Sequence, residues 1–318
     1  MTTCLVTGAA GFIGSRLSHR LLDEGFAVRG VDGFTDSYDP GEKMTAAVRL
    51  VRRDGFSLVT GHLVDLPLEQ HLAGVDVVFH LAARAGVRAS FALESRYRHD
   101  NVASTTSLLA ACRAAGVRRV VYASSSSVYG ESTPPFRETQ PLAPISPYGR
   151  TKLEAEQLCL DASGDELEAV ALRYFTVYGP GQRPDMALRI FAEAALSDRP
   201  IRLLGDGTQS RDFTFVDDIV DATFRAAWAP AAGQALNVGG GDRVTLLEVI
   251  ALLEHLTGRS VQAQVEGFAM GDVHHTGADL SRARRLLGYA PATSFADGYA
   301  REVEWLRADE TLVNRRSA

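Results

Sequence analysis

The sequence predicts an α/β protein built on a doubly wound parallel sheet, with a smaller C-terminal domain. Apolar, β-branched runs alternate with segments of helical apolar spacing through the first half of the chain. This alternation is typical of parallel strands joined by right-handed helical crossovers. A glycine-rich turn follows the first run, and near Gly179 the rhythm gives way to frequent glycine and proline. With 318 residues, of which 46% are hydrophobic, the chain can bury a sizeable core.

Six segments are expected to form buried strands, and three are expected to form helices between them. The strands are residues 4–6, 27–31, 57–59, 75–80, 119–123 and 168–174, and the helices are 13–22, 101–115 and 148–162. We expect residues 1–180 to form the first domain, with a return of the chain to it at 212–240. Residues 181–318 are expected to form mainly the second domain.

Composition limits what the protein can bind. A net charge of −6 and a pI of about 5.8 disfavour a nucleic-acid partner. No apolar run approaches the ~20 residues that span a bilayer, and the N-terminus lacks a signal-peptide pattern. Cys4, Cys112 and Cys159 lack the spacing of a metal or redox site. We therefore expect a cytoplasmic protein with no resident metal, no membrane and no nucleic-acid partner.

The turn after the first strand has the character of a dinucleotide-binding turn. Gly8, Gly11 and Gly14 have the spacing G-x-x-G-x-x-G and lead into the first helix. Glycine permits a tight turn and a close approach of the backbone to a pyrophosphate, which a helix N-terminus attracts. Asp32 ends the second strand, where a carboxylate can bind the adenosine ribose and repel a 2′-phosphate. Together these features favour NAD over NADP.

A tyrosine and a lysine suggest acid–base chemistry. Tyr148 and Lys152 lie four residues apart, and therefore on one face of a helix. A nearby ammonium group favours the phenolate, so Lys152 is expected to lower the pKa of Tyr148. Such a pair is common on exposed helices, but here the serines at 124–127 end the fifth strand, at the sheet edge that binds ligands. Small residues at 81–83 end the fourth strand and would let a cofactor approach.

Taken together, these segments resemble the extended short-chain dehydrogenase/reductase family, particularly its nucleotide-sugar epimerases, dehydratases and decarboxylases. The matching segments are TGAAGFIG at 7–14, HLAARAGVR at 80–88, SSSSVYG at 124–130, YGRTK at 148–152, RYFTVYGPGQRPDMA at 173–187, RDFTFVDD at 211–218 and GDVHHTGAD at 271–279, with Asp65 and Asn101. The resemblance covers nearly the whole chain. It implies a Rossmann fold of the extended type, with NAD on residues 1–180 and a nucleotide sugar mainly on 181–318.

The resemblance also implies roles for individual residues. Tyr148 would be the base, Lys152 would orient the nicotinamide ribose, and Ser125 would hydrogen-bond the reacting oxygen. The cofactor-binding residues would be Gly8, Gly11, Phe12, Ile13, Gly14, Asp32, Asp65, Leu66, Leu81, Ala82, Ala83, Ser124, Tyr148 and Lys152, with Asp65 and Leu66 bordering the adenine. The substrate-binding residues would be Arg88, Ser125, Ser126, Ser127, Thr176, Arg183, Arg211 and Asp272. Asn101 is expected to brace the central helix.

One departure from the family concerns the diphosphate of the substrate. Arg211 resembles the arginine that binds it, and Asp272 resembles the acidic residue near the nucleoside ribose. Many relatives carry a further arginine shortly before the Gly-Asp pair at 271–272, where this chain has Phe-Ala-Met at 268–270. The diphosphate would therefore rest on fewer arginines, or on one that the sequence does not identify.

The reaction depends on the fate of the 4-keto intermediate that the family shares. A 4,6-dehydratase usually carries Asp-Glu before its Val-Tyr-Gly, where this chain has Ser126-Ser127. Decarboxylases of UDP-glucuronate usually carry glutamate immediately before Val-Tyr-Gly and asparagine in place of Thr176. The motifs AGVR and FTVYGPxxRPDMA most resemble UDP-glucuronate 4-epimerases. Ser127 and Thr176 could hold a carboxylate without adding charge, with Arg183 as its counter-ion.

We therefore expect a UDP-glucuronate 4-epimerase, with a UDP-glucuronate decarboxylase as the alternative. A neutral UDP-hexose 4-epimerase and a non-catalytic NAD-binding regulator are further alternatives. The presence of both Tyr148 and Lys152 disfavours the regulator. The resemblance also implies a homodimer held by the helices at 101–115 and 148–162.

Overall fold

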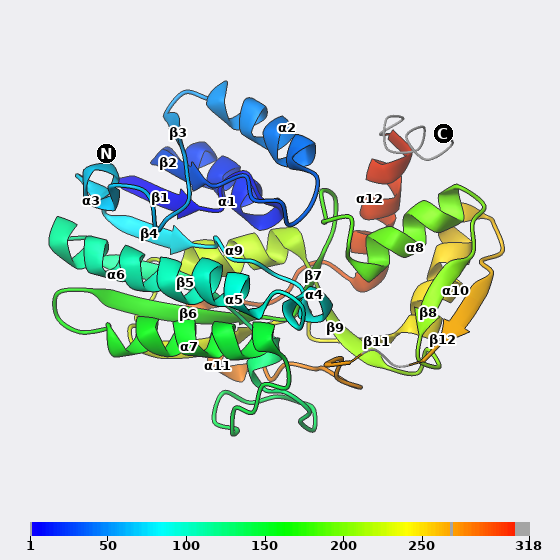
Figure 1. The fold of residues 1–318 in the computed structure, drawn as a ribbon. Helices are drawn as coiled ribbons and strands as arrows, with labels where there is room; N and C mark the ends of the chain where they lie inside the picture. Colours follow the sequence, from blue (N-terminus) through cyan, green and yellow to red (C-terminus); the bar gives the residue numbers. More distant parts are fainter. Residues whose placement is uncertain (1, 268–269, 309–318) are drawn as a thin grey trace.

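The computed structural model describes residues 2–267 and 270–308 and confirms the expected doubly wound sheet (Figure 1). Seven parallel strands pair in the order β10-β6-β5-β4-β1-β2-β3. Their bounds are Thr3–Thr7 (β1), Ala27–Asp32 (β2), Phe56–Thr60 (β3), Val77–His80 (β4), Arg119–Ser125 (β5), Glu168–Tyr174 (β6) and Gln234–Val238 (β10). The strand order reverses between β1 and β4, and ligands of such sheets bind outside the carboxyl ends of the strands at this point.

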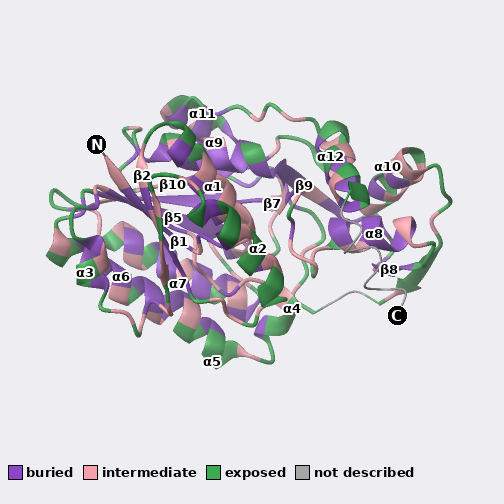
Figure 2. Ribbon diagram, turned by 90° about the horizontal axis from the view of Figure 1, so that it is seen from above, coloured by how far each residue is buried: buried purple, intermediate pink, exposed green. Residues whose placement is uncertain are grey.

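Helices cover both faces of this sheet (Figure 2). One face carries α1 (Phe12–Asp23), α2 (Pro40–Val51), α9 (Val216–Ala226) and α11 (Ser281–Leu287). The other carries α3 (Leu68–Leu72), α6 (Ser104–Ala115) and α7 (Pro147–Asp161). A sheet covered on both faces needs strands that are apolar throughout, and every residue of β5 is buried. No helix in the described part of the chain is long and apolar enough to cross a bilayer.

A second core lies beyond the carboxyl edge of the main sheet (Figure 1). It contains a three-stranded sheet of β11 (Arg243–Thr245), β9 (Ser210–Phe215) and β7 (Thr176–Tyr178), and a two-stranded sheet of β12 (Ala263–Glu266) and β8 (Ile201–Leu204). The helices α8 (Ala187–Leu196), α10 (Leu246–Thr257) and α12 (Phe295–Ala308) pack around it. This core therefore faces the edge at which the loops of the main sheet converge.

The chain moves between the two cores within residues 212–240. β9 pairs with β7 and β11 in the small sheet, whereas α9 packs against the main sheet. β10 then adds the seventh strand beside β6. The main sheet is thus completed by β10, while β9 carries its residues toward the second core.

Several short elements near the carboxyl edge were not expected from the sequence. They are α4 (Val87–Ser90), α5 (Glu94–Tyr97) and a 3₁₀ turn, η2 (Ser126–Val128). The helix expected at 101–115 begins instead with a π-helical segment, η1 (Arg98–Ala103), which runs into α6. Asn101, in η1, donates to Thr151 Oγ1 of α7 at 3.0 Å, which fits the bracing role expected of it.

Candidate active site

A cavity of about 870 Å³ follows the carboxyl edge of the main sheet and is lined by residues of both cores. The turn after β1 and the loops after β2, β3, β4, β5 and β6 all contribute to it. The expected site residues that line it are Gly8, Gly11, Phe12, Ile13, Gly14, Asp32, Leu81, Ala82, Ala83, Arg88, Ser124, Ser125, Ser126, Ser127, Tyr148, Lys152, Thr176, Arg183, Arg211 and Asp272. Residues that the chain separates widely are therefore brought to one continuous surface.

The residues expected beside the adenine lie next to the cavity and are not part of its lining. Asp65 and Leu66, both among the described residues, lie outside the cavity lining, and His62 and Leu63 line it instead. The chain turns directly after β3, and the N–H groups of Asp65 and Leu66 donate back to His62 O at 2.9 and 3.2 Å. The first residues after the strand therefore face the cavity, and the expected pair lies one turn beyond it.

The glycine turn fits closely against the end of β4. A Cβ on Gly14 would lie 2.1 Å from Gly8 O, so only glycine can occupy this position. Gly8 has φ 70°, and a Cβ on it would lie 3.0 Å from the N atom of Ala82. The turn thus brings bare backbone and the N-terminus of α1 to the cavity wall, an arrangement that fits a dinucleotide pyrophosphate.

Asp32 is buried and held by the backbone around it. Its carboxylate accepts from the N–H of Ala10 at 3.0 Å and from the N–H of Phe34 at 2.8 Å. Lys43, on α2, lies nearby and also lines the cavity, donating to Thr35 O at 3.2 Å. Burial lowers the pKa of Lys43. Sequence reasoning missed this residue, because a single lysine in an amphipathic helix gives no signal of its own.

Tyr148 lines the cavity at the start of α7. Burial raises the pKa of Tyr148, while a hydrogen bond with Ser125 and the charge of Arg183 act to lower it. Tyr97 packs edge-on against the Tyr148 ring, with the ring centroids 6.2 Å apart. The helix begins at a cap in which Ser146 Oγ accepts from the N–H of Gly149 at 3.1 Å. This cap fixes the first turn, and with it the position of Tyr148.

Lys152 lies one turn along the same helix. Its Nζ donates to Ala123 O at 2.5 Å and lies 4.4 Å from the centre of the Tyr122 ring. Burial lowers the pKa of Lys152 to about 7. In the protein alone, Ser125 and Arg183 are the groups that act to lower the pKa of Tyr148, and the expectation that Lys152 lowers it stays a prediction.

The serines at the end of β5 make two different sets of contacts. Ser124 Oγ donates to Glu156 Oε2 at 2.5 Å, and Glu156 forms a buried ion pair with Arg173 at 2.6 Å. Ser125 Oγ accepts from the N–H of Ser127 at 3.1 Å, which caps η2, and it also hydrogen-bonds Tyr148. Ser125 is thus held beside the tyrosine hydroxyl, as a residue contacting the reacting oxygen must be.

Arginines line the part of the cavity that the second core covers. Arg183 pairs with Asp185 at 3.0 Å, and Arg211 pairs with Asp272 at 3.3 Å. Arg211 also donates to His274 O at 3.0 Å, so its guanidinium is held at a fixed place. The two residues expected at the nucleotide, Arg211 and Asp272, are therefore brought together.

The cavity half covered by the second core is also lined by an arginine that the sequence analysis did not single out. Arg202, on β8, pairs with Glu266 through two contacts of 2.6 and 2.8 Å. It adds a cation to the half of the cavity that the second core covers. Residues 268–269, part of the segment where many relatives carry a further arginine, lie outside the described part of the chain.

The fold and this cavity define a dinucleotide-binding α/β protein whose second core covers the carboxyl edge of the sheet. Residues 4–239 match the model of the NAD dependent epimerase/dehydratase family, and the chain belongs to this family.

Relatives of known name are similar over nearly their whole length. The UDP-glucuronate 4-epimerase of Thermodesulfobacterium geofontis is 39% identical, with 97% of each chain covered. An uncharacterized UDP-glucose epimerase of Bacillus subtilis, YtcB, is 40% identical, with 95% of this chain and 97% of the relative covered. The crystal structure of UDP-glucuronic acid 4-epimerase from Bacillus cereus, in complex with UDP-glucuronic acid and NAD, superposes with a TM-score of 0.94 at 37% identity. That comparison covers 96% of this chain and 99% of the other.

Proposed function

We propose that the protein is an NAD-dependent UDP-glucuronate 4-epimerase. The observation that carries the proposal is the group of hydroxyls beside Tyr148, with one guanidinium close by. Ser125, Ser126, Ser127 and Thr176 line the cavity, and the charge of Arg183 reaches Tyr148. Uncharged donors and one cation suit a carboxylate next to the reacting carbon. The names of the relatives support the same substrate.

The first core carries the residues that would hold NAD. Gly8, Gly11 and Gly14 would bind the pyrophosphate at the N-terminus of α1, and Phe12 and Ile13 would lie over it. Asp32 would accept from the adenosine ribose, while His62 and Leu63 take the place beside the adenine. Leu81, Ala82, Ala83 and Ser124 would border the remainder of the cofactor. When bound there, NAD would supply reversible hydride transfer at C4 of the sugar.

Proton transfer would fall to Tyr148, with Ser125 holding the reacting oxygen. Because burial raises the pKa of Tyr148 in the protein alone, its deprotonation depends on positive charge in the cavity. Arg183 supplies some of this charge, and Lys152 would add more on binding the nicotinamide ribose. Tyr148 would remove the C4 hydroxyl proton as C4 is oxidised, and return a proton when C4 is reduced.

The sugar and its nucleotide would lie on the second core. Arg211 would bind the diphosphate and Asp272 the nucleoside ribose, with Arg88 and Arg202 at hand for the remaining phosphate oxygens. A 4-keto uronic acid loses CO₂ readily, so an epimerase has to hold the carboxylate while the sugar ring turns. Ser127, Thr176 and Arg183 would hold the carboxylate in this way. Weaker binding of the carboxylate would allow loss of CO₂, which is the decarboxylase reaction that the sequence left as the alternative.

A proton NMR time course of the purified protein with UDP-glucuronate tests the proposal. UDP-galacturonate that retains its carboxylate is the expected product. A UDP-4-keto-pentose or UDP-xylose with release of CO₂ would make the protein a decarboxylase and overturn the assigned hold on the carboxylate. Turnover of UDP-glucose but not of UDP-glucuronate would instead make the protein a neutral hexose epimerase, as the name of the Bacillus subtilis relative suggests.

The proposal extends to the organisation of the protein. It includes an NAD domain of residues 1–180 with the return at 212–240, a substrate domain mainly of residues 181–318, a homodimer through α6 and α7, and a cytoplasmic location. Light scattering of the purified protein tests the dimer.

A further inference from the structure

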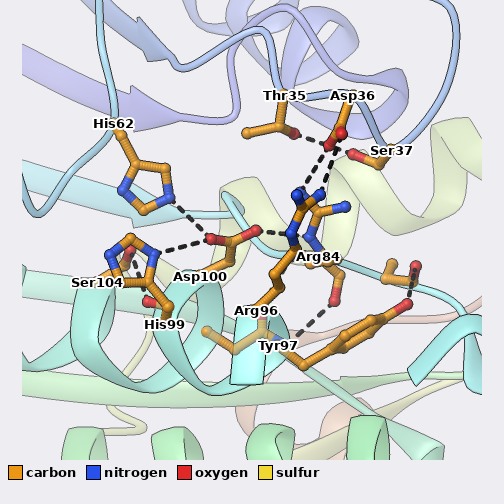
Figure 3. Close-up of polar contacts among 12 residues, drawn as sticks. Thr35, Asp36, Ser37, His62, Arg84, Arg96, Tyr97, His99, Asp100 and Ser104 are labelled. Atoms are coloured by element: carbon orange, nitrogen blue, oxygen red, sulfur yellow. Dashed lines mark hydrogen bonds and ion pairs between the residues drawn. The ribbon is translucent and has the colours of Figure 1, made fainter. Parts of the chain in front are cut away.

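A chain of charged side chains crosses one end of the cavity, between loops that follow neighbouring strands (Figure 3). Arg84, after β4, donates from Nε to Asp100 Oδ2 at 2.6 Å and from Nη2 to Asp36 Oδ1 at 2.9 Å. Asp36, in the loop after β2, also accepts from Arg96 Nη1 at 3.2 Å. His62, after β3, donates from Nε2 to Asp100 Oδ1 at 3.1 Å. Hydrogen bonds and ion pairs thus join the loops that follow β2, β3 and β4.

Arg84 is fixed to the body of the protein. Its side chain is 9% exposed, and that of its partner Asp100 is 12% exposed. The Asn101 side chain accepts from the N–H of Arg84 at 2.7 Å and donates to Arg84 O at 3.1 Å. Asp100 and Asn101 are neighbours in the π-helical segment η1, and both contact Arg84 there. π-helical turns are rare and occur frequently at functional sites.

Asp36, in contrast, is an exposed residue of a largely half-buried loop that lines one side of the cavity. Its side chain is 69% exposed and lies outside the cavity lining, whereas its neighbours Thr35 and Ser37 line the cavity. Phe34, two residues earlier, has φ 47°, a left-handed conformation that is strained for an L-residue. The Asp36 carboxylate therefore ties a strained loop, residues 33–39, to the fixed guanidinium of Arg84.

The histidines of this cluster raise the question of a metal ion. Ligand atoms of His62, His99 and Asp100 lie within 4.8 Å of one another. The guanidinium of Arg84, however, is bound at 2.6 Å to the same carboxylate and would repel a divalent cation. The contacts favour a chain of ion pairs over a metal centre.

We propose that the Asp36–Arg84 ion pair closes loop 33–39 over the adenosine end of bound NAD and sets the rate at which the cofactor leaves. This inference rests on the proposed function, because it takes Asp32 and His62 as the adenosine end of an NAD site. Release of NAD requires the loop to move away from Arg84, which its buried partners hold in place. An epimerase needs such retention, since losing its cofactor midway would strand the 4-keto sugar.

The test measures the release of NAD from the full chain without any sugar. Protein loaded with NAD is diluted into an NAD-consuming enzyme, and the NAD still bound is quantified by chromatography over time. Asp36→Ala should release NAD about three- to tenfold faster than the wild type, since a largely exposed ion pair makes a modest contribution. Raising NaCl from about 0.05 M to about 0.5 M should narrow this difference, because salt screens the pair in the wild type.

Asp198→Ala is the matched control. Asp198 is 77% exposed and pairs with Arg259 at 2.9 Å, away from the cavity, so its loss should leave the release rate unchanged. Asp36→Asn, which keeps the shape and removes the charge, should release NAD at an intermediate rate. Equal release rates for Asp36→Ala, Asp198→Ala and the wild type would overturn the proposal. A wild-type protein that binds no NAD would instead remove the proposed function, so the two failures are distinct.

Discussion

Among single residues, Glu302 on α12 makes the stability of the protein depend on pH. Its side chain is fully buried and accepts from the N–H of Gly179 at 3.0 Å, while its Oε1 has no hydrogen-bond partner among the described residues. Burial raises the pKa of Glu302 from 4.5 to about 8. Between these values the folded protein keeps a proton that the unfolded chain has lost. The free energy of unfolding therefore falls as the pH rises through this window.

Glu302→Gln should remove this dependence, because the amide is neutral at every pH and can still accept from Gly179. Relative to the variant, the wild type should lose roughly 2–4 kcal/mol of unfolding free energy between pH 5 and pH 8, measured by urea denaturation. Glu304→Gln, an exposed neighbour on the same helix, is the control and should follow the wild type. Parallel pH profiles for the wild type and Glu302→Gln would show that Glu302 is ionised when folded.

The site residues differ in how far sequence could predict them. Tyr148, Ser125 and Asp32 were placed correctly at the cavity, because each follows a strand or opens a helix at the carboxyl edge. His62 was missed in favour of Asp65, since the turn after β3 decides which residue faces the cavity. The burial that raises the pKa of Tyr148 could not be predicted, because spacing along a helix carries no information about desolvation.

Among the elements, strands were easier to predict than the connections between them. A strand that is buried on both faces, such as β5, carries an apolar stretch, here residues 120–123, that stands out in the sequence. The π-helical segment η1 could not be recognised in the sequence. An extra residue in one helical turn leaves the apolar spacing nearly unchanged. The sequence also did not predict that β9 pairs with β7 in the small sheet. It is β10 that takes the edge of the main sheet beside β6, and strand pairing of this kind depends on the folded arrangement of the whole chain.

The contact of α8 with α2 is the element-scale feature with the clearest energetic consequence. Arg189 on α8 is fully buried and donates to Glu42 on α2 at 2.7 Å and to Glu193 on its own helix at 2.9 Å. It also donates to Gln182 O, in the loop that carries Arg183. Arg189 therefore joins the two cores and supports the arginine assigned to the substrate carboxylate.

Arg189→Met should destabilise the protein by about 3–5 kcal/mol, because it leaves the buried carboxylate of Glu193 without this guanidinium. Urea denaturation monitored by circular dichroism measures the loss. Glu42→Gln is the matched comparison: it breaks only the contact between α2 and α8, at a partly exposed carboxylate, and should cost about 1 kcal/mol or less. Equal costs for the two variants would contradict the view that burial of Arg189 dominates.

At the scale of the whole molecule, the two cores meet along one cavity but present different chemistry to it. The first core contributes the glycine turn, Asp32 and the end of β4, which suit a dinucleotide. The second contributes Arg202, Arg211 and Asp272, which suit a nucleoside diphosphate. If each ligand depends on its own core, binding of one can be removed while binding of the other is kept.

Thermal denaturation with each ligand alone tests this division. NAD and UDP, each at about 100 times its Kd, should stabilise the wild type by ~2.7 kcal/mol, a rise in Tm of roughly 4 °C. Arg211→Met should abolish the rise with UDP and keep the rise with NAD, because Arg211 belongs to the second core alone. Arg225→Met, which removes an exposed arginine paired with Asp221 on α9, is the control and should keep both. Loss of both rises in Arg211→Met would mean that the two cores bind their ligands as one unit, and the assignment of each ligand to its own core would then fail.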